Sequence, residues 1–141
     1  QAVTINGVKF YGSPWVPNLS GWAFYASAQR LRDRFADIPN DTNVLITHGP
    51  PSGELDLIPG VTVVGECHGL EEDEWTDDAG LHVGSMALLQ RVKQLKALKL
   101  HVFGHIHESA GRSNGSVNAA ICDRHYQATN LPIVVDVVHS S

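Results

Sequence analysis

Leu100-His101-Val102-Phe103-Gly104-His105-Ile106-His107-Glu108 is the stretch around which this 141-residue chain is organised. An apolar run ends at a glycine, and two histidines follow at alternate positions. A shorter version occurs earlier, where the apolar run 43–47 leads into His48-Gly49-Pro50-Pro51. Short, uniformly apolar runs predict buried strands, and open α/β sheets bind ligands beyond the carboxyl ends of their strands. Both runs therefore predict strands that deliver histidines to a turn at their carboxyl ends.

The rest of the chain predicts a hairpin, two main helices and further strands. Residues 3–5 and 8–11 predict two strands joined by Asn6-Gly7, the strongest short signal for a hairpin turn. An apolar stripe at helical spacing predicts one helix from Phe24 to Phe35, and Ser85 is the expected N-cap of a second. Short strands are expected at 117–121 and 133–138. Strands that alternate with helices predict a single α/β domain over residues 1–141, with an at least partly parallel sheet.

Residues 52–84 interrupt this pattern. Hydrophobic periodicity is lost there, and Trp75 is the one large apolar anchor of the segment. The segment is strongly acidic, with Glu66, Glu71, Glu72, Asp73, Glu74, Asp77 and Asp78. We expect an insertion loop, and loops of this length in a compact domain usually have a function or are mobile.

The composition excludes several classes of protein. A net charge of −5 and the lack of any Lys/Arg run argue against a nucleic-acid partner. No stretch approaches the roughly 20 apolar residues of a membrane-spanning helix, so no membrane association is expected. Cys67 and Cys122 lack the spacing of a metal or redox motif and do not make a disulfide framework. We expect a protein of a reducing compartment, the cytoplasm.

The three histidines that follow the two central strands, His48, His105 and His107, predict a metal site. Imidazole is a common ligand of Zn, Mn and Fe, and a catalytic site needs about three protein ligands and an open position. On an extended segment, alternate residues share a face. A single His-x-His is more often without function, but both motifs at strand ends in one α/β domain favour the metal interpretation. His68 and His82 are candidate spare ligands, and Glu108 and His82 are candidates for proton transfer.

Several stretches together resemble a known family, the calcineurin-like metallophosphoesterases. Thr47-His48-Gly49-Pro50-Pro51 and Gly104-His105-Ile106-His107-Glu108 resemble the last two motifs of that superfamily. The match is closer to its metallophosphoesterase-domain (MPPED-type) phosphodiesterase branch, through residues 10–15, 21–24, 101–104 and 129–132. The resemblance covers the C-terminal half of the family only. None of the Asp-x-His, Gly-Asp and Gly-Asn-His/Glu motifs of the earlier half precedes Thr47 in this sequence.

The resemblance implies half of an αββα sandwich, with a mixed sheet and two main helices. It also implies a two-metal centre that hydrolyses phosphodiesters, in which His48 and His105 hold one ion and His107 holds the other. With only half of the motifs present, four arrangements stay open. The three histidines could hold a single ion, a second copy of the chain could complete the site as a homodimer, the acidic insertion could supply ligands, or the chain could be an inactive remnant.

The expected function is that of a metal-dependent hydrolase acting on a small-molecule phosphodiester or other ester. A carboxylic ester is as compatible as a phosphodiester, because the Lewis-acid role is the same. The alternative is a catalytically inactive metal-binding or subunit protein derived from such an enzyme. A metal that only stabilises the fold is a third possibility.

Overall fold

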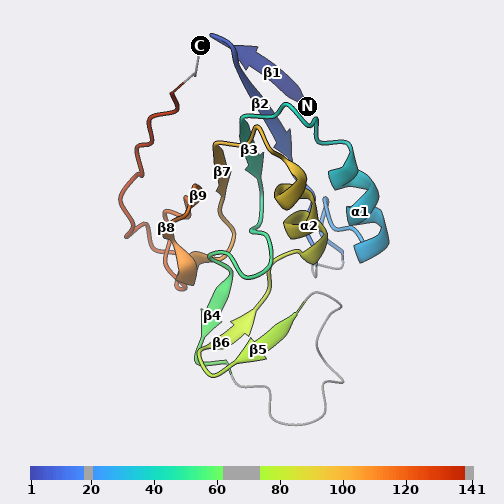
Figure 1. Ribbon diagram of the computed structural model, residues 1–141. Coiled ribbons are helices and arrows are strands. Elements are labelled where there is room, and N and C mark those ends of the chain that lie inside the picture. Colours follow the sequence, from blue (N-terminus) through green and yellow to red (C-terminus); the bar gives the residue numbers. More distant parts are fainter. Residues whose placement is uncertain (18–20, 62–73, 139–141) are drawn as a thin grey trace.

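A computed structural model describes residues 1–17, 21–61 and 74–138 of the chain (Figure 1). Its main feature is a mixed six-stranded sheet in the order β1-β2-β3-β7-β9-β8. These strands are β1 (Ala2–Ile5), β2 (Val8–Ser13), β3 (Val44–Thr47), β7 (Leu100–Phe103), β8 (Gly111–Ser113) and β9 (Ser116–Asn118). The four inner strands are mutually parallel, and β1 and β8 join antiparallel at the edges. The predicted α/β class with a mixed sheet and two helices is confirmed.

The hairpin at the N-terminus forms where the sequence predicted it. Asn6 and Gly7 have φ angles of 48° and 80°, the left-handed pair that a two-residue type I′ turn needs. The register pairs Ile5 with Val8 across this turn. The turn residues alone therefore fix how β1 lies along β2.

The two helices, α1 (Ala28–Ala36) and α2 (Met86–Gln94), cover one face of the sheet (Figure 1). Their buried side chains form one apolar cluster with Leu45 of β3. As predicted, Ser85 caps α2, because its side chain accepts a hydrogen bond from the Leu88 N–H at 3.3 Å. The predicted start of α1 was wrong: Ser27 has an extended backbone, and Phe24 lies before the helix. The apolar spacing of Phe24 imitates a helical face, but the turn that contains it is bridged to residue 16 instead.

The opposite face of the sheet carries a second apolar cluster formed by Val8, Val44, Leu100 and Val117. Residues 131–138 run beside this face, and Ile133, Val135 and Val137 pack on it. The strand predicted at 133–138 is therefore not present as a ladder strand. Its alternating pattern has another cause, since every second side chain contacts the sheet face while the backbone lies outside the sheet.

Residues 52–84, expected to be a loop, contain a second sheet. Its three antiparallel strands are β4 (Leu57–Pro59), β5 (Trp75–Asp77) and β6 (Gly80–His82), in the order β4-β6-β5. Strands of three residues are too short for a period of two to appear in the sequence. A Cβ on Gly80 would lie 2.2 Å from the Ile58 carbonyl oxygen, so the close pairing requires glycine there. Cys67, His68 and the acidic run 71–73 lie outside the described residues.

Within the described ranges, neither helix is long and apolar enough to cross a membrane.

Candidate metal site

The two histidine turns lie side by side at the end of the main sheet where the inner strands β3 and β7 finish. β3 and β7 are parallel neighbours, so their carboxyl ends meet there. The N–H of Gly104 donates to the carbonyl of His48 at 3.0 Å and joins the two turns directly. The imidazoles of His48 and His105 lie with their ring centres 4.8 Å apart, tilted by 44°. The structure thus brings His48 and His105 together at these strand ends, and their role as metal ligands stays a prediction.

The left-handed backbone conformation of His105 sets the direction of its ring. His105 has a φ of 74°, a conformation that costs a residue with a side chain about 1 kcal/mol or more. The ring turns back over Gly49, where an added Cβ would lie 3.8 Å from its Cδ2 atom. The assumption of an extended segment was wrong, because His107 begins a short 3₁₀ helix, η1 (His107–Ser109). His105 and His107 therefore do not share a face in the manner of a strand.

His107 is oriented by a backbone carbonyl. Its Nδ1 atom lies 2.9 Å from the carbonyl oxygen of Asp123, and the edge of Tyr126 packs against the ring. A carbonyl only accepts, so Nδ1 carries the proton and Nε2 keeps its lone pair. Histidines that ligate metals are commonly held in this way. Glu108, the predicted proton-transfer candidate next to it, is exposed on η1.

The surroundings of His105 favour the neutral form of its imidazole. Burial, and then the nearby His48 and His107, lower the pKa of His105 below its ordinary value. Neutral imidazole is the form that binds a metal ion. Across the described ranges, however, no three His, Cys, Asp or Glu side chains are grouped as ligands for one ion. The His48–His105 pair fits as two ligands of a metal, and the convergence of all three histidines on one ion stays a prediction.

Two buried side chains that the sequence did not single out hold these turns. The Nε2 atom of His101 lies 2.9 Å from Thr47 Oγ1, which itself donates to the Gly49 carbonyl at 2.7 Å. The Nδ2 atom of Asn118 in β9 donates to the carbonyl of Ile106 at 2.8 Å. Both turns are thus fixed from inside the sheet. Neither role has a local sequence signal, because each partner is distant along the chain.

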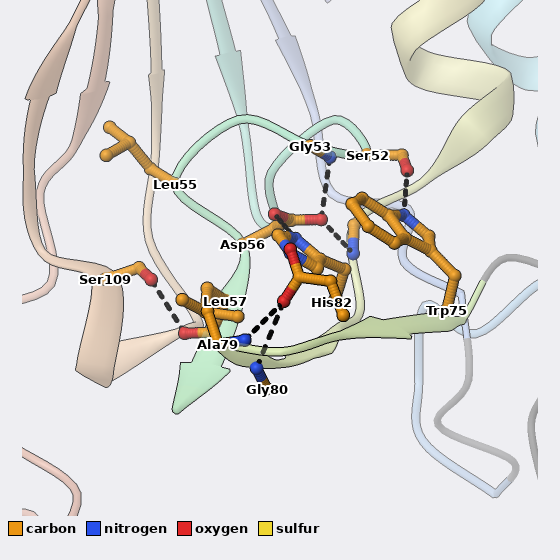
Figure 2. Close-up of polar contacts among 12 residues, drawn as sticks. Ser52, Gly53, Leu55, Asp56, Leu57, Trp75, Ala79, Gly80, His82 and Ser109 are labelled. Carbon is orange, nitrogen blue, oxygen red and sulfur yellow. Dashed lines mark hydrogen bonds and ion pairs between the residues drawn. The ribbon is translucent and has the colours of Figure 1, made fainter. Parts of the chain in front are cut away.

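His82, a candidate spare ligand and proton carrier, has a different environment from the one expected. Its Nδ1 atom lies 2.7 Å from Oδ1 of Asp56, and its Nε2 atom lies 3.3 Å from Oδ2 of Asp77. The ring of Trp75 stacks on the His82 ring, with ring centres 3.7 Å apart and ring planes 4° from parallel (Figure 2). With both nitrogens facing carboxylates, His82 does not project towards the paired histidines as a free ligand. It belongs to a clasp formed by Asp56, Trp75, Asp77 and His82.

Asp56 anchors this clasp and was missed by sequence reasoning. Its carboxylate is 1% exposed and also accepts hydrogen bonds from the N–H groups of Gly53 at 2.8 Å and Gly84 at 3.1 Å. The hydroxyl of Ser109 on η1 donates to the Leu57 carbonyl at 2.7 Å (Figure 2). The clasp and this bond hold the small sheet against the end of the main sheet where the histidines lie.

Two cavities adjoin the histidine pair. The first, of about 170 Å³, includes His105 in its wall and is bounded by Ile58 and Val83 of the insertion. The second, of about 320 Å³, includes His48 in its wall. Each ring of the pair thus lines one cavity, and both cavities are lined mainly by apolar side chains.

Comparison with known proteins finds relatives of the metallophosphoesterase-domain type. The chain is 39% identical over 140 residues to metallophosphoesterase domain-containing protein 1 of Homo sapiens, and equally to that of Mus musculus. The match covers 96% of this chain and 37% of each relative. Over nearly its whole length, the chain resembles the C-terminal half of a metallophosphoesterase.

A UPF0046 protein of Caenorhabditis elegans is 38% identical over 139 residues, which cover 95% of this chain and 40% of that protein. No family model matches. The chain spans 37 to 40% of the length of these relatives.

Proposed function

We propose that this metallophosphoesterase half contributes His48, His105 and His107 to a metal-dependent hydrolase site that acts on a phosphodiester or a related small ester. The observation that supports this most strongly is the pair of imidazoles 4.8 Å apart at the ends of two adjacent parallel strands. Family membership supports the use of a divalent ion in general. Imidazole ligands suit Zn, Mn or Fe.

The chain's own residues have separable tasks in this proposal. His48 is exposed and meets the substrate side of the site, while His105 is half-buried and kept neutral by its surroundings. His107 presents Nε2 because its other nitrogen is bonded to a carbonyl. A bound ion would supply Lewis-acid chemistry towards the ester oxygen and water.

The test combines metal binding with turnover. Zn²⁺ and Mn²⁺ binding is measured by calorimetry, and hydrolysis of bis(4-nitrophenyl) phosphate and 4-nitrophenyl acetate by absorbance. We expect His48→Ala and His105→Ala to weaken metal binding at least tenfold, about 1.4 kcal/mol, and to abolish chelator-sensitive turnover. Gln90→Ala on the exposed side of α2 is the matched control and should change neither. Turnover that survives both histidine substitutions would refute the proposed site.

A second candidate, an inactive metal-binding or subunit protein, is favoured by one observation. The described residues group no three metal ligands. In that case the calorimetry shows binding, but no ester is hydrolysed. If chelation lowers the melting temperature without any activity to lose, the ion serves only the fold.

A second copy of the chain is the partner we propose. Ile46 lies in β3 at the middle of the main sheet, yet 46% of its surface is exposed. Apolar side chains in a central strand are normally covered. Dimerisation through this face would cover them and could bring further ligands to the site.

A further inference from the structure

We propose that the cavity beside His48 is a subsite for a flat aromatic group of the ester substrate. The inference rests on the proposed hydrolase function and adds the substrate class. Besides His48, the cavity is lined by Pro14, Val16, Trp22, Ala23 and Phe24. Apart from the indole N–H of Trp22, the imidazole is the one polar side-chain group among these residues. The cavity therefore suits an apolar group joined to a polar centre at the histidine.

The two aromatic side chains of the cavity wall, Trp22 and Phe24, are exposed, and this exposure does not stabilise the fold. Trp22 is 66% exposed and Phe24 is 51% exposed, although the core of the same domain buries Phe35 almost completely. Leaving large aromatic surface in water loses roughly 25 cal/mol for each Å² that could be buried. A ligand that covers both rings recovers this free energy, since aromatic residues carry the largest apolar contact areas.

The wall is nevertheless held in place. The N–H of Val16 donates to the Phe24 carbonyl, and the N–H of Ala26 donates to the Val16 carbonyl, both at 3.1 Å. The Phe24 ring meets the Trp15 ring edge to face, with centres 5.9 Å apart. The segment 22–26 is therefore bridged to the turn after β2. A positioned aromatic surface can select a ligand by shape, because little ordering is needed on binding.

The volume fits an aromatic ring. A closed apolar cavity of about 150 Å³ takes up benzene, and this open one measures about 320 Å³. A phenyl or nitrophenyl ring fits with space for its linkage. The cavity beside His105 is smaller, about 170 Å³.

His48 connects the cavity to the chemistry. Its ring lines the cavity and has its centre 4.8 Å from that of His105, so a ring seated against Trp22 and Phe24 places its ester linkage beside the imidazole pair. In the hydrolysis of an aryl phosphodiester, a water oxygen bonds to phosphorus and the P–O bond to the aryl group breaks. The released phenolate and the phosphate monoester share the two protons of that water. Aryl phosphoesters are therefore the class we assign to this subsite.

Binding is tested without turnover, using phenyl phosphate and its non-aromatic analogue cyclohexyl phosphate as probes. Saturation-transfer NMR and calorimetry give the dissociation constants for the full chain. We expect phenyl phosphate to bind more tightly than cyclohexyl phosphate, and Trp22→Ala and Phe24→Ala each to weaken phenyl phosphate about three- to tenfold. Leu131→Ala removes an exposed apolar side chain from another part of the chain and is the matched control, with no change expected.

The outcomes separate the subsite from the proposed function. If both aromatic substitutions leave phenyl phosphate binding unchanged, or if cyclohexyl phosphate binds equally well, the subsite is refuted even when esters are hydrolysed. If no ester is hydrolysed but phenyl phosphate binding depends on Trp22 and Phe24, the hydrolase function fails and the subsite stands. Circular dichroism of each variant verifies that the fold is retained, since both side chains lie outside the core.

Discussion

His101 should make the stability of this domain strongly dependent on pH. The side chain is 1% exposed in β7, and burial lowers its pKa from 6.5 to about 3. Thr47 Oγ1 uses its own proton on the Gly49 carbonyl, so the Nε2–H of His101 donates to Thr47. Its Nδ1 atom then carries the lone pair and is buried without a partner among the described residues. A second proton would place a charge there with no acceptor.

The sign and the size follow from linkage. Because the folded pKa lies below the unfolded value, the unfolded state binds more protons between pH 6.5 and 3. Folding is not penalised above pH 6.5, and the penalty grows as the pH falls towards 3, where it levels off. With pKa values of 6.5 and about 3, the loss from pH 8 to pH 5 is about 2 kcal/mol. The limiting loss below pH 3 is about 5 kcal/mol.

The assay is urea unfolding of the full chain at pH 8, 7, 6 and 5, compared with His101→Leu and His101→Phe. Each variant changes the absolute stability through packing, so the comparison concerns the slope with pH. We expect the free energy of unfolding of the wild type to fall by about 2 kcal/mol more than that of either variant between pH 8 and 5. Parallel curves would mean that the imidazole is protonated in the folded state at no cost, and the argument from burial would be wrong.

Two further predictions concern the clasp and the exposed side chain of Ile46 on the main sheet. Asp56→Ala leaves the buried N–H of Gly84, the part-buried N–H of Gly53 and the His82 ring without their shared acceptor. It should lower the free energy of unfolding by about 3 kcal/mol. Denaturant unfolding measures this, and a loss below about 0.5 kcal/mol would contradict a structural role of the clasp. Ile46→Lys places a charge at the centre of the proposed dimer face, so sedimentation velocity should show a dimeric wild type and a monomeric variant. Equal sedimentation of the two proteins would remove this face as the dimer interface.

The elements that the sequence predicted correctly are those whose conformation depends on residues close together in the chain. The Asn6-Gly7 turn, the Ser85 cap and the apolar runs of β3 and β7 follow from local geometry and periodicity. These elements carry His48 and His105 to the same edge because parallel strands end together. The same reasoning failed for 133–138 and for Phe24. The spacing of apolar residues indicates which side chains are buried. It does not indicate whether the backbone that carries them is a helix, a ladder strand or an irregular segment.

The sequence alone thus determined the α/β class, the strand ends that bear the histidines and the relation to metallophosphoesterases. Only the tertiary structure decided how those histidines point. The left-handed backbone of His105, the carbonyl that orients His107 and the clasp centred on Asp56 all depend on contacts between residues far apart in the chain or on a strained turn that has no local signature. Such contacts form only when the sheet assembles, because the packing of the whole domain compensates for their conformational cost.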